Sequence, residues 1–142
     1  MKYQLWFRSP LFRIEAREDE RTNPMCFGRH LAHWLGDQLE ADGVKVEGVI
    51  PEDWGWCLVV RRKPVLLWVG CGNVHDNSKS VESLPSLPDG KDVVWSCHVV
   101  AEVPLLKRLL RAPDSEPQVK DLFERVHRLV ASAPGTAFVA EP

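Results

Sequence analysis

Residues 56–71 contain two apolar runs that flank a short basic segment, and this pattern constrains the fold more than any other part of the chain. The runs "WCLVV" (56–60) and "VLLWVGC" (65–71) are separated by "RRKP", which is typical of two antiparallel strands joined by a tight turn. Both faces of such a hairpin are apolar, so we expect it to lie in the centre of a sheet.

The register of this hairpin depends on its turn. If Arg61 pairs with Pro64, three apolar pairs face each other across the strands: Val60 with Val65, Leu58 with Leu67, and Trp56 with Val69. Because successive side chains alternate between the two faces of a sheet, Cys57 and Cys71 would then point to opposite faces. A disulfide between these two cysteines is therefore not expected.

Further strands are predicted on both sides of the hairpin. Apolar and polar residues alternate as in half-buried strands in three other segments: residues 2–8, 44–50 and 93–103. Residues 11–16 are apolar enough to extend the first of these strands past Pro10, and the tail 136–142 fits either an edge strand or a frayed end. The polar segment 72–92 is expected to be a long loop, and loops of more than about 12–15 residues commonly carry function.

Two amphipathic helices are predicted from apolar residues at helical spacing, and a short helix is predicted over residues 104–112. For the first helix, Asn23 is a suitable N-cap, Pro24 suits the first position, and Gly43 marks the end. Its apolar stripe consists of Phe27, Leu31, Trp34, Leu35 and Leu39. The last helix begins near Ser115 and ends before Pro134. Its apolar stripe consists of Val119, Leu122, Phe123, Val126, Leu129 and Val130.

Together these elements predict an α+β fold. The chain has 142 residues, which suits a single domain over residues 1–142. We expect one antiparallel or mixed sheet of about four to six strands, with the helices packed on one face.

Charge and composition limit the class of partner. The formal net charge is −2, and a nucleic acid or an anionic membrane would call for a basic patch, so neither partner is expected. The N-terminal segment lacks the apolar run of a signal peptide, and no segment approaches the roughly 20 apolar residues of a membrane span. The four cysteines are scattered without a CxxC pair, as is typical of reduced thiols. We therefore expect a cytoplasmic protein.

The cysteines and histidines do not form a recognisable catalytic or metal-binding motif. Cys71 and His75 are four residues apart, but the neighbours Cys97 and His98 diverge along one strand, so a zinc ion would lack four convergent ligands. Cys26 is the thiol best placed for a lowered pKa, because it lies near the expected start of the first helix. No cysteine carries a known nucleophile signature. We expect no enzymatic activity, no cofactor and no metal.

Acidic residues gather in segments expected to be loops, and they are candidates for binding a basic partner. The candidate carboxylates are Glu18, Asp19, Glu20, Glu52, Asp53, Asp76, Glu82 and Asp89. The chain also has six tryptophans, and tryptophan is enriched at binding hot spots. Trp54 is predicted to lie exposed on a turn formed by Pro51 and Gly55 and to contact the partner. Trp34, Trp56 and Trp68 are expected to lie in the core.

Three stretches carry a resemblance to a known class of protein. They are the helix "HLAHWLGDQLEADG", the corner "PEDWGW" and the strand "LWVGCG". Over residues 23–73 the chain resembles small bacterial immunity proteins, some of which are encoded beside secreted, type VI-like antibacterial toxins. The resemblance implies stoichiometric binding, in the bacterial cytoplasm, to the catalytic domain of a cognate toxin, whose active site the protein would block.

Two other functions stay open on the sequence. A small cytoplasmic enzyme with a Cys/His site would lose its activity when Cys26 or Cys71 is changed. A structural module would self-associate through a sheet edge and form a homo-oligomer without a second gene product.

Overall fold

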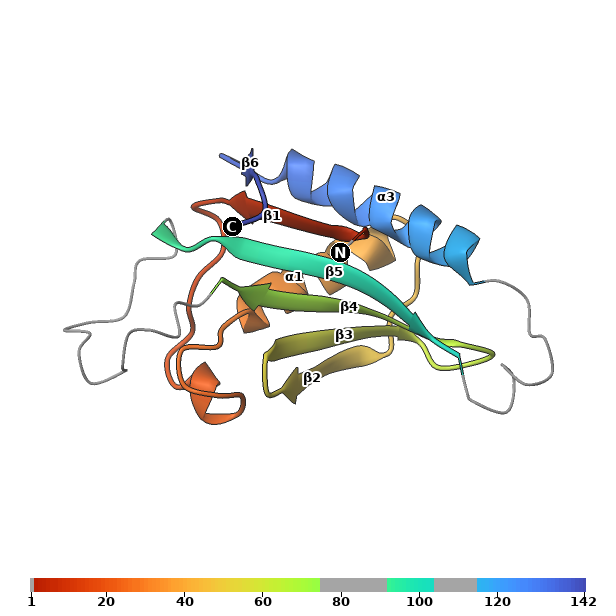
Figure 1. Ribbon diagram of the computed structural model, residues 1–142, viewed down its shortest axis with the longest axis horizontal. Coiled ribbons are helices and arrows are strands. Elements are labelled where there is room, and N and C mark those ends of the chain that lie inside the picture. The colour runs from red at the N-terminus through yellow and green to blue at the C-terminus, as the bar shows by residue number, and fades with distance from the viewer. Residues whose placement is uncertain (1, 75–91, 104–114) are drawn as a thin grey trace.

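The computed structural model describes residues 2–74, 92–103 and 115–142. In this part of the chain, one antiparallel sheet has the strand order β2-β3-β4-β5-β1-β6, and two α-helices pack on it (Figure 1). The strands are β1 (Gln4–Arg8), β2 (Gly48–Glu52), β3 (Gly55–Arg61), β4 (Leu66–Asn73), β5 (Trp95–Glu102) and β6 (Ala137–Val139). The helices are α1 (Arg29–Ala41) and α3 (Glu116–Ser132), and η1 (Glu18–Glu20) is a single 3-10 turn. The predicted α+β fold is confirmed.

Both helices cover the same face of the sheet. α1 packs against β2, β3 and β4, and α3 packs against β5. Leu35 of α1 and Val126 of α3 belong to one buried cluster with Leu58 of β3 and Val69 of β4. The predicted apolar stripe of α3 is confirmed, since Val119, Leu122, Val126, Leu129 and Val130 are buried and Phe123 packs against them. Burial of these side chains is the main favourable term in folding.

Residues 11–16 do not extend β1 as expected. Phe12 is fully buried and makes edge-to-face contacts with Phe7, Trp34 and Trp95. Such aromatic pairs add about 0.5–1.5 kcal/mol beyond their buried area. The chain therefore leaves the sheet after Arg8 so that this ring can enter the core between α1 and the strands.

The predicted hairpin is present, with a different register. A β-bulge lies between Val59 and Arg61, so Leu58 pairs with Val69 and Trp56 pairs with Cys71. The register has moved by two residues, which leaves each side chain on its original face. Cys57 and Cys71 accordingly point to opposite faces, as predicted, and both are free thiols.

β2 begins four residues later than expected and runs through Pro51 to Glu52. Proline is tolerated here because β2 is an edge strand, where the missing N–H costs no ladder hydrogen bond. The turn between β2 and β3 consists of Asp53 and Trp54, since Glu52 pairs with Gly55. Pro51 and Gly55 therefore flank the turn within the strands.

The two ends of the chain lie side by side in the sheet. β6 pairs with β1, so the tail forms an edge strand, one of the two forms that its sequence allowed. The short helix predicted over residues 104–112 lies outside the described residues. In the segment 72–92, which was expected to be a loop, the first two residues belong to β4, because this strand continues to Asn73. Residues 75–91 of that segment lie outside the described residues.

α1 starts at Arg29, later than the expected start at Pro24. Its N-cap is Gly28, with φ of 142°, and a Cβ at this glycine would lie 2.5 Å from the Cys71 carbonyl oxygen. Glycine supplies the positive φ and the close approach, but it has no side chain with which to cap the helix.

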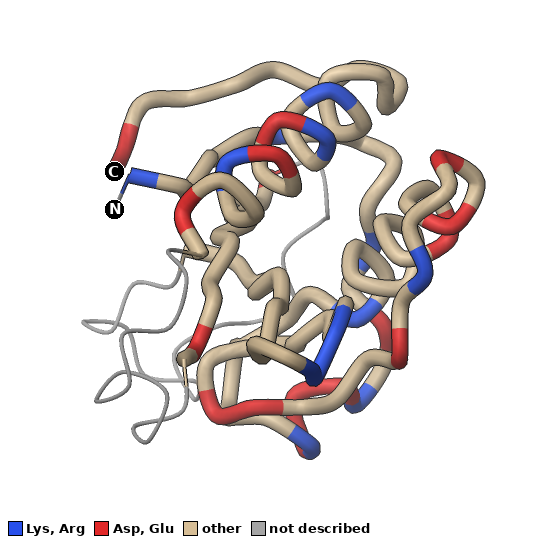
Figure 2. The backbone as a smooth tube through the Cα atoms, turned by 90° about the vertical axis from the view of Figure 1, so that its right-hand side faces the viewer, with Lys and Arg blue, Asp and Glu red and all other residues tan. Residues whose placement is uncertain are grey.

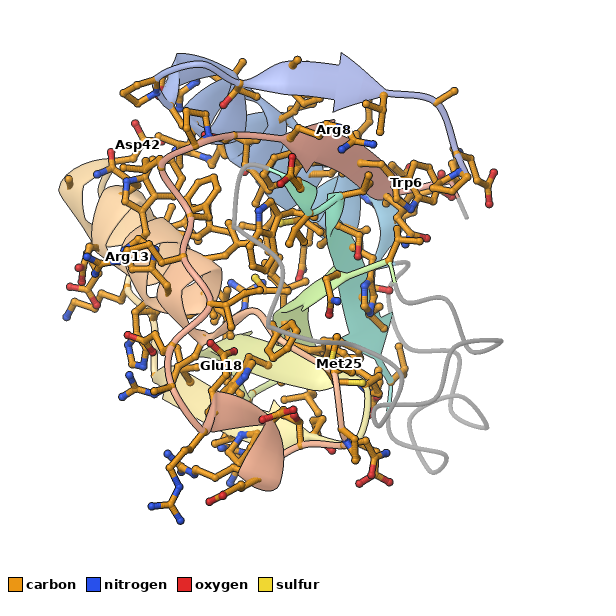
Figure 3. All side chains as sticks on the ribbon, turned by 90° about the vertical axis from the view of Figure 1, so that its left-hand side faces the viewer. Trp6, Arg8, Arg13, Glu18, Met25 and Asp42 are labelled. Carbon is orange, nitrogen blue, oxygen red and sulfur yellow. The ribbon has the colours of Figure 1, made fainter. Side chains whose placement is uncertain are left out.

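The Glu18 carboxylate caps α1 from a distance in sequence. Its Oε1 accepts hydrogen bonds from the backbone N–H groups of Gly28 (2.8 Å) and Arg29 (3.1 Å), and its Oε2 accepts one from Glu15 (2.6 Å). The side chain points inward from the η1 turn (Figure 3), and the residue is only 3% exposed. A negative charge at a helix N-terminus is also favoured by the helix dipole.

Replacing Glu18 with glutamine tests this cap. Glu18→Gln is expected to lower the free energy of unfolding by about 2 kcal/mol, because an amide NH2 group would face backbone donors in a buried site. Urea denaturation measures the loss. The neighbouring Glu20→Gln, which removes an exposed carboxylate, is the matched control and should change stability by less than about 0.5 kcal/mol. Equal stability of the two variants would contradict the capping role of Glu18.

Candidate functional site

The face of the sheet opposite the helices carries the candidate site. Within the described residues, no helix packs on this face. Trp6 belongs to it, since its side chain points away from α1 (Figure 3). The strand register places these side chains on it: Ile50, Glu52, Cys57, Val59, Leu66, Trp68, Ser96, His98, Val100, Gln4 and Trp6. Most of them are apolar or aromatic, which is unusual for a sheet face without a covering layer.

Trp54, Trp68 and His98 form an aromatic cluster at the centre of this face. The two indole rings are stacked, with centroids 5.6 Å apart and an interplanar angle of 25°. The His98 ring lies 5.2 Å from Trp54 and 5.3 Å from Trp68. Trp54 comes from the β2–β3 turn, Trp68 from β4 and His98 from β5, so three separate segments build the cluster.

Glycines in β4 make room for this cluster. A Cβ at Gly70 would collide with the His98 ring, and a Cβ at Gly72 would lie 3.3 Å from the Trp54 carbonyl oxygen. Glycine inside a strand often marks such a close approach. The sequence "VGCG" is therefore explained by the rings that fold over β4.

Partial burial of His98 affects its titration. Burial lowers the pKa of His98, because desolvation disfavours the charged imidazolium. The folded state therefore favours the neutral imidazole, which packs against both tryptophan rings.

A small cavity lies beside the two tryptophans, and we call it the tryptophan trough. Its volume is about 240 Å³. The trough is lined by Ile50, Glu52, Trp54, Cys57, Val59, Arg62, Leu66, Trp68 and Glu102. Trp54 is 40% exposed and Ile50 is 39% exposed, so the apolar wall of the trough reaches solvent. The site combines an aromatic wall, an aliphatic floor and charged groups at the rim.

The predicted partner-binding residues fall in different places. Glu52, Asp53 and Trp54 are exposed, as expected, and lie at the trough or next to it. Glu18 is buried and caps α1, so the interpretation of this residue as a surface carboxylate was wrong. Three further candidates, Asp76, Glu82 and Asp89, lie outside the described residues.

Asp19 and Glu20 lie on the η1 turn. Asp19 Oδ2 accepts a hydrogen bond from the Met25 N–H at 3.0 Å, and Glu20 forms an ion pair with Arg17 at 3.0 Å. Both Asp19 and Asp53 act electrostatically on the Cys26 thiol, which places these two acidic segments at the same end of the molecule. The fold thus joins acidic groups that are far apart in the sequence.

Cys26 lacks the lowered pKa that its sequence position suggested. Burial, together with the charges of Asp19 and Asp53, raises its pKa, and the residue precedes α1 instead of starting it. Burial also raises the pKa of Cys57 to about 12. The hydrogen bond with Cys97, together with burial, raises the pKa of Cys71. These three thiols are poorly suited to act as thiolate nucleophiles at neutral pH.

The described residues contain neither a metal-binding cluster nor a membrane-spanning helix. In residues 2–74, 92–103 and 115–142, no group of three or more His, Cys, Asp or Glu side chains is arranged to hold a metal ion. Among the described helices, none has the length and apolar content needed to cross a membrane.

A larger cavity of about 750 Å³ lies on the helix side, between the segment after α1 and the first half of α3. Two arginines of its lining are used within the fold: Arg61 donates to Gln118, and Arg125 pairs with Asp42 and Asp121. We place the candidate site in the smaller trough, because it is lined by Trp54, an aromatic residue that is 40% exposed.

Sequence reasoning missed two parts of the site. Trp68 was assigned to the core, but it is half-buried on the uncovered face, and His98 was considered only as a metal ligand. The paired glycines Gly70 and Gly72 were the signal that side chains from other segments fold over β4.

Comparisons with known proteins do not place this chain in a family. No family model matches it, and no curated protein or solved structure gives a significant match. The site must therefore be interpreted from its own geometry.

The lowered pKa of His98 predicts how stability changes with pH. The unfolded chain takes up a proton on this histidine near pH 6.5, whereas the folded chain does so only at lower pH. The unfolding free energy should therefore fall as the pH decreases below about 6.5. His98→Gln should reduce this pH dependence in urea titrations.

Two comparisons support that measurement. His33→Gln removes an exposed histidine of α1 and serves as the control. His30, whose pKa burial also lowers, is retained in both variants and contributes equally to them. An unchanged pH dependence in His98→Gln would show that His98 does not titrate differently in the folded state.

Proposed function

We propose that this protein binds another protein through the uncovered face of its sheet, with the aromatic cluster at the centre of the contact. The observation that carries this proposal is the Trp54–Trp68 stack on an apolar face, in which Trp54 is exposed and Trp68 is half-buried. Tryptophans surrounded by apolar groups are the commonest hot spots of protein interfaces. Burying such a surface in a complex removes apolar area from water.

The charges around the face indicate the chemistry of the partner. Glu52, Asp53 and Glu102 are exposed at its edges, and acidic and basic positions are interspersed over the rest of the described backbone (Figure 2). A phosphate backbone would be repelled by this rim, since nucleic-acid binding requires clustered lysines and arginines. A protein with a basic surface is the complementary partner.

We assign the protein to the immunity class: it binds a cognate bacterial toxin stoichiometrically in the cytoplasm and blocks the toxin's active site. The resemblance over residues 23–73 supports this assignment, and this segment contains both stacked tryptophans. The site chemistry agrees with it, because binding needs exposed rings and carboxylates rather than an activated nucleophile.

Co-expression with the product of the adjacent gene tests the proposal. We expect a 1:1 complex that survives gel filtration with the wild-type chain. The double variant Trp54→Ala with Asp53→Lys should lose the complex, because it removes the central ring and reverses a rim charge. Asp37→Lys, a charge reversal on the exposed side of α1, is the matched control and should keep the complex.

Two outcomes would overturn the proposal. One is a folded monomer that forms no complex with the adjacent gene product. The other is a concentration-dependent homodimer, measured by light scattering, that forms through the same face and is lost with Trp54→Ala, which would support the self-associating module instead.

A further inference from the structure

We infer that the tryptophan trough receives an arginine side chain of the partner, with its guanidinium group against the Trp54 ring and paired with a glutamate of the rim. This inference rests on the proposed function, because it specifies what the uncovered face recognises. It depends on three features of the trough: its size, its aromatic wall and the two carboxylates at its rim.

The trough has the size of one long side chain. Its volume of about 240 Å³ is below the range of about 300–1,000 Å³ that is usual for drug-sized ligands. Its floor is apolar, formed by the buried side chains of Cys57 and Val59. An arginine has three methylene groups that can pack on such a floor while the charged end stays near the rim.

The aromatic wall favours a cation. A guanidinium or ammonium group within about 6 Å of a tryptophan ring is attracted by the negative face of the ring, and tryptophan is the best of the aromatic residues for this contact. One face of Trp54 stacks on Trp68, and the 40% exposure of Trp54 leaves part of the ring open to solvent. The same protein uses this contact elsewhere, since Arg21 and Arg29 lie 5.1 and 5.8 Å from the Trp56 ring.

The rim supplies negative charge. Glu52 and Glu102 line the trough from β2 and β5, and within the described residues neither forms an ion pair with a lysine or arginine. Arg62 is the one cation of the lining, and its Nε is paired with Glu47 at 3.0 Å. The charges of both trough glutamates also reach the buried floor, where they add to the burial that raises the pKa of Cys57. Among the described residues, Glu52 and Glu102 thus have no cationic partner, and an incoming cation can pair with them.

Guanidinium fits the arrangement better than ammonium. It is planar, so it stacks on an indole ring, and its N–H groups can donate in pairs to a carboxylate at the edge of the plane. An ammonium group is a compact, strongly hydrated charge that uses only one of these contacts well.

Titration of the labelled protein with a small arginine compound tests the inference. The probe is N-acetyl-arginine amide, and the readout is the NMR shift of the Trp54 and Trp68 indole N–H signals. We expect a saturable shift for both signals. N-acetyl-citrulline amide is the matched control probe, because it has the same length and a planar end but no charge, and it should give no saturable shift.

Variants connect the binding to the rim and the wall. Glu52→Gln and Glu102→Gln should each weaken probe binding by about twofold to fivefold, as expected for partly exposed ion pairs. Trp54→Ala should abolish the shift of the Trp68 signal. Glu124→Gln, a change of the same kind on α3, should leave probe binding unchanged.

The outcomes separate this inference from the proposed function. Equal shifts with citrulline, or no effect of either glutamate change, would overturn cation recognition. Tighter binding of N-acetyl-lysine amide would overturn the choice of guanidinium. If the wild-type chain forms the co-expressed complex but does not bind the arginine probe, protein docking stands and this inference fails. If the probe binds but no complex forms, the docking proposal fails.

Discussion

The close approach of two backbone segments to β4 organises the molecule. A Cβ at Gly28 would lie 2.5 Å from the Cys71 carbonyl oxygen, and a Cβ at Gly55 would lie 2.7 Å from the same atom. Gly28 is the N-cap of α1, and Gly55 follows the turn that carries Trp54. The start of the covering helix and the candidate site are thus fixed by contact with one carbonyl group. Asn73 strengthens this junction, since its side chain accepts from the Phe27 N–H and donates to the Met25 carbonyl.

The same strands contribute side chains to the buried core on one face of the sheet and to the aromatic cluster on the other face. On the helix side, the even-numbered positions of β3 belong to the buried core together with Leu67, Val69 and Cys71 of β4. On the other side, Trp68, Gly70 and Gly72 of β4 lie in a row, so one aromatic ring is followed by two residues without a side chain. The empty space over these glycines is filled by His98 and by the turn of Trp54. Two of the three rings of the cluster, Trp68 and His98, therefore come from β4 and β5, the two middle strands of the sheet.

The sequence predicts the local features of this fold well and the long-range ones poorly. Alternation and helical spacing identified the hairpin, the stripe of α3 and the exposure of Trp54, because these depend on neighbours within one element. The start of α1 was wrong because its cap is Glu18, a carboxylate ten residues before Gly28, which no local capping pattern describes. Trp68 was predicted to lie in the core because the sequence of an apolar strand does not show whether one or both of its faces are covered. The trough itself joins β2, β3, β4 and β5, and only the register of the strands shows that their side chains meet.

The acidic groups near the site are concentrated at one end of the sheet. Asp53 and Asp19 belong to segments more than thirty residues apart, yet both lie near Cys26, so negative charge collects at the end of the sheet where the Trp54 turn lies. Charges of this kind are screened over about 8–10 Å at physiological salt, so they act on a partner only as it approaches this end. In the proposed complex, these charges would raise the association rate. The tryptophan rings, once buried against the partner, would determine the dissociation rate. Changes at Asp19 or Asp53 should then alter mainly association, whereas changes at Trp54 should alter mainly dissociation, because electrostatic steering acts before contact and apolar burial acts only after it.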